Sequence, residues 1–195
     1  MNGKPRVAVF IDGSNLYFAV RDGLRIQKPI DIQKFSHKLV EDRELVRIYY
    51  YNAPPPPEDD PEVRIQQQRF RDKLGYIDFL QRRDGRLVER TFKVKCPDCG
   101  KEIEYKRHIQ KGVDTRLAVD LVTMAVRDSY DIGILVSGDG DFTEGVNFVK
   151  EHTRKRIENA FVLWRGWDKG LREAADRRII LTSEFFSDCL VDKKE

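Results

Sequence analysis

The chain has 195 residues, of which 40% are hydrophobic and 35% are charged, and its net charge is +3. This length fits one domain, residues 1–195, and no apolar run is long enough to span a bilayer. The first residues lead directly into an apolar run without a signal peptide, so we expect a cytoplasmic protein with no membrane partner. Three cysteines, an odd number, argue against a disulfide framework.

Apolar runs alternate with amphipathic stretches along most of the chain, which predicts an α/β fold with a mostly parallel central sheet. The predicted strands are residues 6–11, 45–51, 76–80, 131–136, 157–163 and 179–181. The predicted helices are residues 16–20, a helix capped by Asp31, and residues 61–74, 114–127, 142–152, 170–175 and 185–190. The proline-rich residues 54–60 predict an extended loop.

Residues 82–111 interrupt the alternation of strands and helices. Two short predicted strands, 87–95 and 102–108, flank a Cys-Pro-Asp-Cys-Gly turn, which indicates an inserted β-hairpin. This segment has ten Lys or Arg against five Asp or Glu, a local charge of +5. Its cations, with Phe92 and Tyr105 between them, could follow a nucleic acid backbone and stack on bases. The alternative is a solvated hairpin with long polar side chains.

Cys96 and Cys99 in this hairpin have the spacing of a zinc knuckle. Structural zinc takes four ligands, so two cysteines are half of a site. His108 is a candidate third ligand, whereas Cys189 is remote in sequence. Two chains could also pair their knuckles around one Zn²⁺ ion, which would make a homodimer. The alternative is a turn that carries two free thiols.

Four aspartates lie where an α/β sheet would bring carboxylates together: Asp12, Asp114, Asp139 and Asp141. The first follows the apolar run 7–11, the second opens a predicted helix, and the last two follow the run 132–136. Ligands of an open parallel sheet bind outside the carboxyl ends of its strands. Gathered carboxylates repel one another unless a hard cation neutralises them, and oxygen ligands suit Mg²⁺ or Mn²⁺. The pattern therefore predicts metal-assisted phosphodiester chemistry.

Four polar residues beside these aspartates are candidates for contact with the substrate: Ser14, Asn15, Ser137 and Lys111. Each motif also has a purely structural interpretation. Residues 12–15 could be a turn with a helix cap, and Asp114 and Asp141 are favoured caps. Asp120 lies about 240° around the helix from Asp114, so we do not expect it to bind the same ion.

Three segments resemble the NYN domains of the LabA-like group, in the PIN-like nuclease superfamily: VAVFIDGSNLY, KGVDTRLAVDLV and DIGILVSGDGDF. Their order and spacing match, and the resemblance spans about residues 6–181. It implies a Rossmann-like, PIN-type three-layer sandwich with an acidic, metal-dependent site that cuts RNA. The family's acidic positions match the four aspartates, and its polar position matches Asn15. Similar Cys-x-x-Cys-Gly insertions occur in LabA-like proteins.

We therefore expect a metal-dependent ribonuclease that binds RNA and uses Mg²⁺ or Mn²⁺. The metal would have to supply the nucleophile, because no histidine lies in the three segments. The alternative is a non-catalytic RNA-binding or regulatory module that affects gene expression. A phosphatase-like or nucleotide-binding enzyme is disfavoured, because the chain has no Walker A motif and no Gly-x-Gly-x-x-Gly after its first strand.

Overall fold

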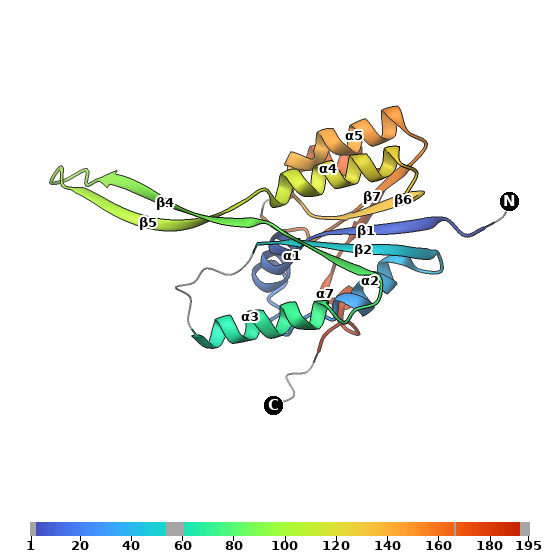
Figure 1. The fold of residues 1–195 in the computed structure, drawn as a ribbon, viewed down its shortest axis with the longest axis horizontal. Coiled ribbons are helices and arrows are strands. Elements are labelled where there is room, and N and C mark those ends of the chain that lie inside the picture. Colours follow the sequence, from blue (N-terminus) through green and yellow to red (C-terminus); the bar gives the residue numbers. More distant parts are fainter. Residues whose placement is uncertain (1–2, 54–60, 166, 192–195) are drawn as a thin grey trace.

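The computed structural model describes residues 3–53, 61–165 and 167–191 (Figure 1). Six parallel strands form one sheet in the order β3-β2-β1-β6-β7-β8. Their bounds are β1 Arg6–Asp12, β2 Glu44–Asn52, β3 Leu80–Asp84, β6 Ile132–Val136, β7 Arg156–Phe161 and β8 Arg177–Ile180. The strand order reverses between β1 and β6, so the carboxyl ends of these two strands form the switch point at which such sheets bind ligands.

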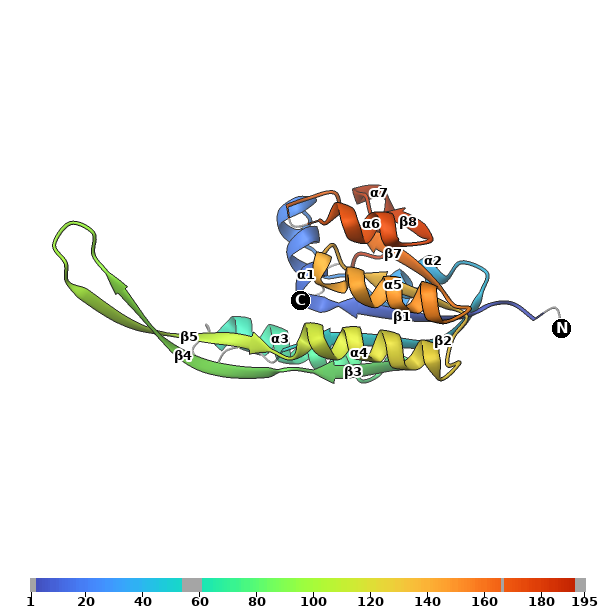
Figure 2. The ribbon, with the colours of Figure 1, turned by 90° about the horizontal axis from the view of Figure 1, so that it is seen from above.

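Helices cover both faces of the sheet, which gives three layers (Figure 1), and the view from above shows the helices of one face in front of the strands (Figure 2). The helices are α1 Gly13–Phe18, α2 Ile32–Val40, α3 Pro61–Leu74, α4 Val113–Val126, α5 Thr143–His152, α6 Lys169–Ala174 and α7 Ser183–Phe186. Two short helical turns, η1 Ala19–Gly23 and η2 Gly140–Phe142, follow α1 and precede α5. One core contains side chains of α1, α2, α3 and α7, and the other contains side chains of α4, α5 and α6.

Alternation along β1 explains the two cores. Val7, Val9 and Ile11 face the first core, whereas Ala8 and Phe10 face the second, and all five are buried. A parallel strand covered on both faces therefore has a continuous apolar sequence. Helix α4 contributes Leu117, Leu121 and Ala125 to the second core, at the four-residue spacing that places side chains on one helix face.

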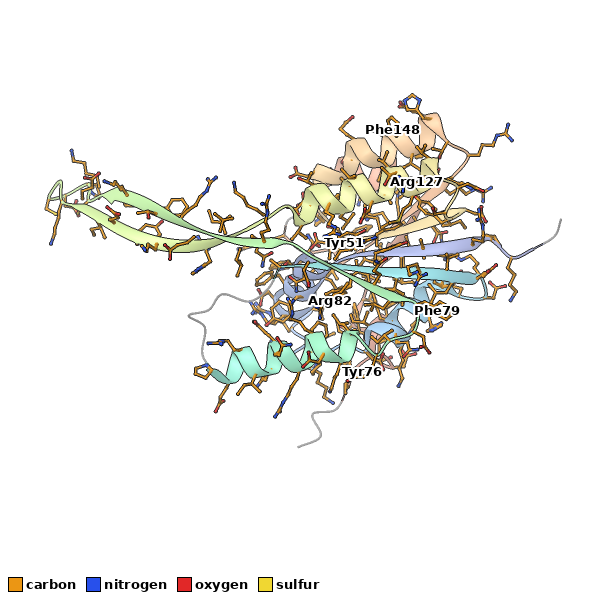
Figure 3. The ribbon with its side chains drawn as sticks, in the orientation of Figure 1. Tyr51, Tyr76, Phe79, Arg82, Arg127 and Phe148 are labelled. Carbon is orange, nitrogen blue, oxygen red and sulfur yellow. The ribbon has the colours of Figure 1, made fainter. Side chains whose placement is uncertain are left out.

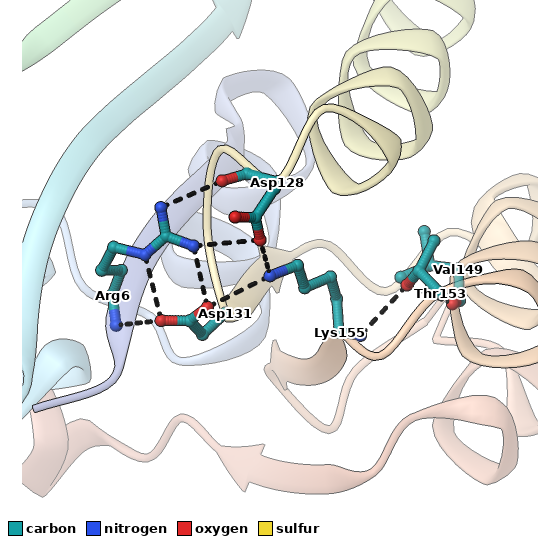
Figure 4. Close-up of polar contacts among 6 residues, drawn as sticks. All are labelled: Arg6, Asp128, Asp131, Val149, Thr153 and Lys155. Carbon is teal, nitrogen blue, oxygen red and sulfur yellow. Dashed lines mark hydrogen bonds and ion pairs between the residues drawn. The ribbon is translucent and has the colours of Figure 1, made fainter. Parts of the chain in front are cut away.

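An ion cluster joins the amino ends of β1, β6 and β7, at the opposite end of the sheet from the switch point (Figure 4). The guanidinium of Arg6 donates to both carboxylate oxygens of Asp131, at 3.1 and 2.9 Å, and also pairs with Asp128. Lys155 pairs with both aspartates. These bonds hold the pKa of Asp131 well below its usual range, with the Arg6 hydrogen bond as the largest cause.

The basic hairpin follows β3 directly, after the single residue Gly85. Its strands are β4 Arg86–Lys95 and β5 Glu102–Lys111, paired antiparallel over their whole length. The hairpin extends away from the sheet, with side chains along its whole length (Figures 1 and 3). A Cβ at Gly85 would lie 2.4 Å from a methyl group of Val113, so the hairpin can leave the sheet close to α4 only with glycine here.

The structure confirms the α/β class, the parallel sheet and the inserted hairpin, and it corrects three elements. The strand predicted at residues 76–80 is wrong: residues 76–79 turn, Phe79 has a φ of +61°, and β3 begins at Leu80. The first helix begins at Gly13 rather than at residue 16, and the last ends at Phe186 rather than at residue 190. The loop predicted at residues 54–60 lies outside the described residues. No described helix is both long and apolar enough to cross a membrane.

Candidate functional site

Asp12 is the last residue of β1 and also the cap of α1. Its carboxylate accepts a hydrogen bond from the backbone N–H of Asn15 at 3.0 Å. Only 4% of the residue is exposed. Glycine at position 13 allows the turn to pack against Tyr50, because a Cβ there would lie 2.7 Å from the tyrosine ring. The sequence thus carries an acidic group from a buried strand into the switch point without exposing it.

Ser137 and Asn15 connect the ends of β1 and β6. The hydroxyl of Ser137 donates to the carboxylate of Asp12 at 3.2 Å and accepts from the N–H of Asp139 at 3.1 Å. The side-chain oxygen of Asn15 accepts from the N–H of Gly138 at 3.0 Å. Two predicted contact residues therefore fix the relative positions of two predicted acids.

The loop after β6 presents Asp139 and Asp141. Asp139 caps η2, since its carboxylate accepts from the N–H of Asp141 at 3.0 Å. Asp141 is exposed and lies in the first turn. A Cβ at Gly140 would lie 2.7 Å from the carboxyl carbon of Asp168, so glycine allows the loop to pack closely there.

Asp114 approaches from the start of α4. Gly112, with a φ of +79°, makes the left-handed turn that starts this helix after β5. Partial desolvation raises the pKa of Asp114, and the charges of Asp139 and Asp141 add to that shift. Burial raises the pKa of Asp12 to about 6; repulsion from Asp114 and Asp139 adds to it, and hydrogen bonds from Asn15 and Ser137 oppose it. The four aspartates therefore repel one another.

No basic side chain balances this negative charge: within residues 3–53, 61–165 and 167–191, none of the four aspartates forms an ion pair. In that same part of the chain, no three His, Cys, Asp or Glu side chains converge closely enough to enclose an ion. The donors are nonetheless all oxygens, and the raised pKa values show uncompensated charge. Both properties fit Mg²⁺ or Mn²⁺.

Three other residues discussed from sequence form no hydrogen bond with the four aspartates in the described part of the chain. The hydroxyl of Ser14 contacts Asn52 and Gln110, at 3.1 and 3.2 Å, and so links α1 to the base of the hairpin. Lys111 is exposed at the end of β5. Asp120 accepts a hydrogen bond from Tyr51 at 2.9 Å and lies 3.4 Å from Arg83, which confirms that it has other partners than the cluster.

Sequence reasoning missed two residues that support the site. Asn159 of β7 is buried and donates to the carbonyls of Leu135 and Ser137, at 3.2 and 2.8 Å, which holds the end of β6. The N–H of Asp168 donates to the carbonyl of Gly138 at 2.8 Å. A polar residue in a buried strand was the available signal for Asn159; nothing near Asp168 in sequence suggested its contact.

The structure does not support zinc at the hairpin turn. Cys96 and Cys99 are free thiols. Hydrogen bonds from Cys99 and Asp98 lower the pKa of Cys96. His108 is paired in register with Glu89, whereas the cysteines lie beyond the Lys95–Glu102 pair at the far end. Six residues of strand separate His108 from that end, roughly 20 Å. Each chain therefore offers two thiols, which is half of a zinc site.

The fold and these strand ends define a Rossmann-like α/β protein with an acidic, oxygen-rich centre at its switch point. The model of the NYN domain family matches residues 6–182, so the chain belongs to the NYN domain family. It is 27% identical to the low amplitude and bright protein LabA of Synechococcus elongatus over 179 residues, which cover 90% of this chain and 83% of LabA.

A solved structure has the same fold. It is a protein of unknown function from Vibrio parahaemolyticus, with a TM-score of 0.67 and 21% sequence identity. The match covers 98% of this chain and 99% of the other.

Proposed function

We propose that this protein is a metal-dependent ribonuclease that hydrolyses RNA phosphodiester bonds at the acidic switch point. One observation carries the proposal: Asp12 is buried beside Asp114 and Asp139, and its pKa is raised to about 6. A fold gains nothing in stability from such a group, because burial and repulsion both disfavour its charge. Perturbed groups of this kind gather at functional sites. Membership of the NYN domain family, with its likeness to PIN-like nucleases and to RNA-binding domains, supports the same activity.

The proposed roles follow from the positions of the side chains. The carboxylates that would hold one or two Mg²⁺ or Mn²⁺ ions are Asp12, Asp114, Asp139 and Asp141. When bound there, a divalent ion would polarise the phosphate and make water a stronger nucleophile at neutral pH. Asn15 and Ser137 orient the loop that bears Asp139.

The hairpin would bring RNA to this site. Arg90 lies directly opposite Arg107, and Arg86 lies opposite Lys111. Like charges facing each other destabilise a hairpin, and none of these four residues has an ion-pair partner within the described ranges. A polyanion would relieve that repulsion. The rings of Phe92 and Tyr105 stack on each other two residues beyond the Arg90–Arg107 pair, with centroids 5.5 Å apart.

The test is cleavage of labelled RNAs and DNAs in Mg²⁺, Mn²⁺ or EDTA by the wild type, Asp12→Asn and Asp139→Asn. Asp78→Asn is the matched control, because Asp78 is an exposed carboxylate in the turn before β3. We expect metal-dependent RNA cleavage by the wild type and the control, and none by the two site variants. Metal-dependent cleavage retained in either site variant would contradict the assignment. Salt-sensitive RNA binding without cleavage would favour the non-catalytic RNA-binding module.

A further inference from the structure

A half-open cavity of about 130 Å³ adjoins the acidic centre. Asn15 and Gly138, which are bonded to each other at the centre, form one side of it. Phe18, Trp164 and Trp167 form aromatic walls. The cavity therefore shares two residues with the proposed site of phosphate chemistry but has a different chemical character.

The walls of the cavity expose aromatic surface. Phe18 is 45% exposed and Trp167 is 37% exposed, whereas Trp164 packs partly against the core. Single exposed hydrophobic side chains are common, but here two large rings line the same cavity beside a polar centre. Rings in this arrangement present flat faces that a planar group can stack on.

Cations surround the aromatic walls. The guanidinium of Arg21 lies 5.0 Å from the centroid of Phe18, and that of Arg172 lies 4.6 Å from the centroid of Trp167. Arg165 also lines the cavity and has no ion-pair partner within the described residues. Asp22 pairs with Arg21 at 2.6 Å, so Arg165 and Arg172 supply the positive charge of the rim. This charge next to the aromatic walls suits a ligand with both a planar ring and a phosphate.

Hydrogen bonds connect the aromatic wall of the cavity to the acidic centre. Trp167 is followed by Asp168, whose N–H donates to the carbonyl of Gly138 at 2.8 Å. The N–H of Gly138 in turn donates to the side chain of Asn15 at 3.0 Å. A ring held in the cavity would therefore lie at a fixed position relative to Asp12 and Asp139.

We propose that this cavity binds one unstacked base of an RNA strand, next to the phosphate that reaches the acidic centre. The volume limits the occupant to a single ring system, since an apolar cavity of about 150 Å³ accommodates one benzene. A paired base could not enter, because its partner would have to enter with it. The inference rests on the proposed function, and it adds that the substrate is single-stranded at the cleaved position.

The two tryptophans of the chain make the test direct, because both line this cavity. Intrinsic fluorescence is followed while a short unstructured RNA is added in EDTA, with an abasic oligonucleotide of equal length and charge as the comparison. We expect the RNA to quench the fluorescence and the abasic strand to leave it unchanged at the same concentrations. Free tryptophan amide corrects for absorption by the bases.

Substitutions test whether RNA binding depends on the rings of this cavity. Phe18→Leu keeps apolar bulk and removes the ring, and we expect it to weaken RNA binding roughly 5- to 150-fold, the range for loss of one base-stacking contact. Phe148→Leu is the control, because Phe148 is similarly exposed on α5, over the other face of the sheet (Figure 3). Equal quenching by the abasic strand, or equal affinity of Phe18→Leu and wild type, would overturn the proposal.

Loss of the base site and loss of the nuclease activity would give different results in these experiments. Base-dependent quenching without any metal-dependent cleavage would keep the base site and remove the catalytic role. Cleavage that Phe18→Leu retains in full, together with unchanged fluorescence, would keep the nuclease and remove the base site.

Discussion

The side-chain oxygen of Asn15 accepts a hydrogen bond from the backbone N–H of Gly138 at 3.0 Å. This bond joins the first turn after β1 to the loop after β6, which are separated by 123 residues in sequence. Because Asp12 and Asp139 lie on the two sides of the bond, their relative position depends on it.

Asn15→Ala should therefore reduce activity more than stability. Loss of one hydrogen bond costs about 1 kcal/mol of unfolding free energy. Misplacement of Asp139 should lower kcat/KM for RNA at least roughly tenfold, since small shifts of reacting groups are costly. Steady-state cleavage and urea unfolding measure the two effects. Asn147→Ala on α5 is the control, and equal kcat/KM in both variants would contradict the positioning role.

Asp12→Asn should stabilise the protein above pH 6 in the absence of divalent metal. The pKa of Asp12 is raised from 3.8 to about 6 in the folded state. The folded state therefore holds this proton more tightly than the unfolded state does. Protonated Asp12 contributes its full stabilisation below about pH 4, and this contribution is lost as the pH rises through about 6. A shift of about two units corresponds to roughly 3 kcal/mol. Asparagine removes this cost and keeps an oxygen to accept from the N–H of Asn15.

The measurement is urea unfolding in EDTA at pH 4 and pH 8 for wild type, Asp12→Asn and Asp78→Asn. The gain of Asp12→Asn over wild type should be larger at pH 8, and the control should show none. Adding Mn²⁺ at pH 8 should then stabilise the wild type more than Asp12→Asn. A variant that is less stable than wild type at pH 8 in EDTA would contradict the burial of an uncompensated charge.

Glu158→Gln should destabilise the fold without direct effect on the site. Glu158 of β7 is 6% exposed and pairs with Arg43 at 2.7 Å. The same guanidinium donates to the carbonyls of Leu39 and Val40, at 2.8 and 2.9 Å, so it also holds the end of α2. Neutralising Glu158 leaves the Arg43 guanidinium with only a 3.9 Å contact to the half-exposed Glu41, and breaking such a buried pair costs about 3 kcal/mol.

Glu173→Gln is the matched control for the buried pair. Glu173 pairs with Lys169 at 3.5 Å, and both side chains are exposed. Water screens such a pair, so its loss should cost less than about 1 kcal/mol. Urea unfolding of the two variants compares them directly, and equal losses would show that burial does not determine the strength of the Arg43 pair.

Most of the sheet was predictable because its strands are covered on both faces. β6 is buried at all five positions, and its sequence is accordingly four aliphatic residues and one glycine. The failure at residues 76–80 has a physical cause. Tyr76 and Phe79 have the composition of a strand, but they are 88% and 57% exposed. Pairing with β2 decides where β3 begins, and that contact is not local in sequence.

The acidic centre was predictable for a related reason. Asp12, Asp139 and Asp141 follow recognisable strands, and parallel strands end at one edge of a sheet. Asn159 and Asp168 act through β7 and the segment that follows it, at 22 and 30 residues from their partners Ser137 and Gly138. Their contacts depend on the neighbour of β6 in the sheet, which no local pattern specifies.

The salt dependence of RNA binding should identify the cations of the hairpin that contact RNA. Arg90 and Arg107 face each other without an ion-pair partner within the described residues, whereas Lys93 and Lys106 pair with Glu104 and Glu89. Each phosphate contact to a single strand contributes about 0.7 to the slope of log affinity against log salt. Replacing both arginines by glutamine should make the slope less steep by about 1.4. Replacing both lysines should change it less, because their charges are already balanced.

Filter binding of an unstructured RNA over a series of salt concentrations, in EDTA, measures these slopes. The double arginine variant should also be at least as stable as wild type, since it removes a repulsion between facing charges. Equal slopes for wild type and the arginine variant would remove the hairpin from the path of the RNA. A larger change in the lysine variant would place the RNA on the opposite face of the hairpin. Arg90 and Arg107 share one face, and Lys93 lies on the other because it is an odd number of residues from Arg90.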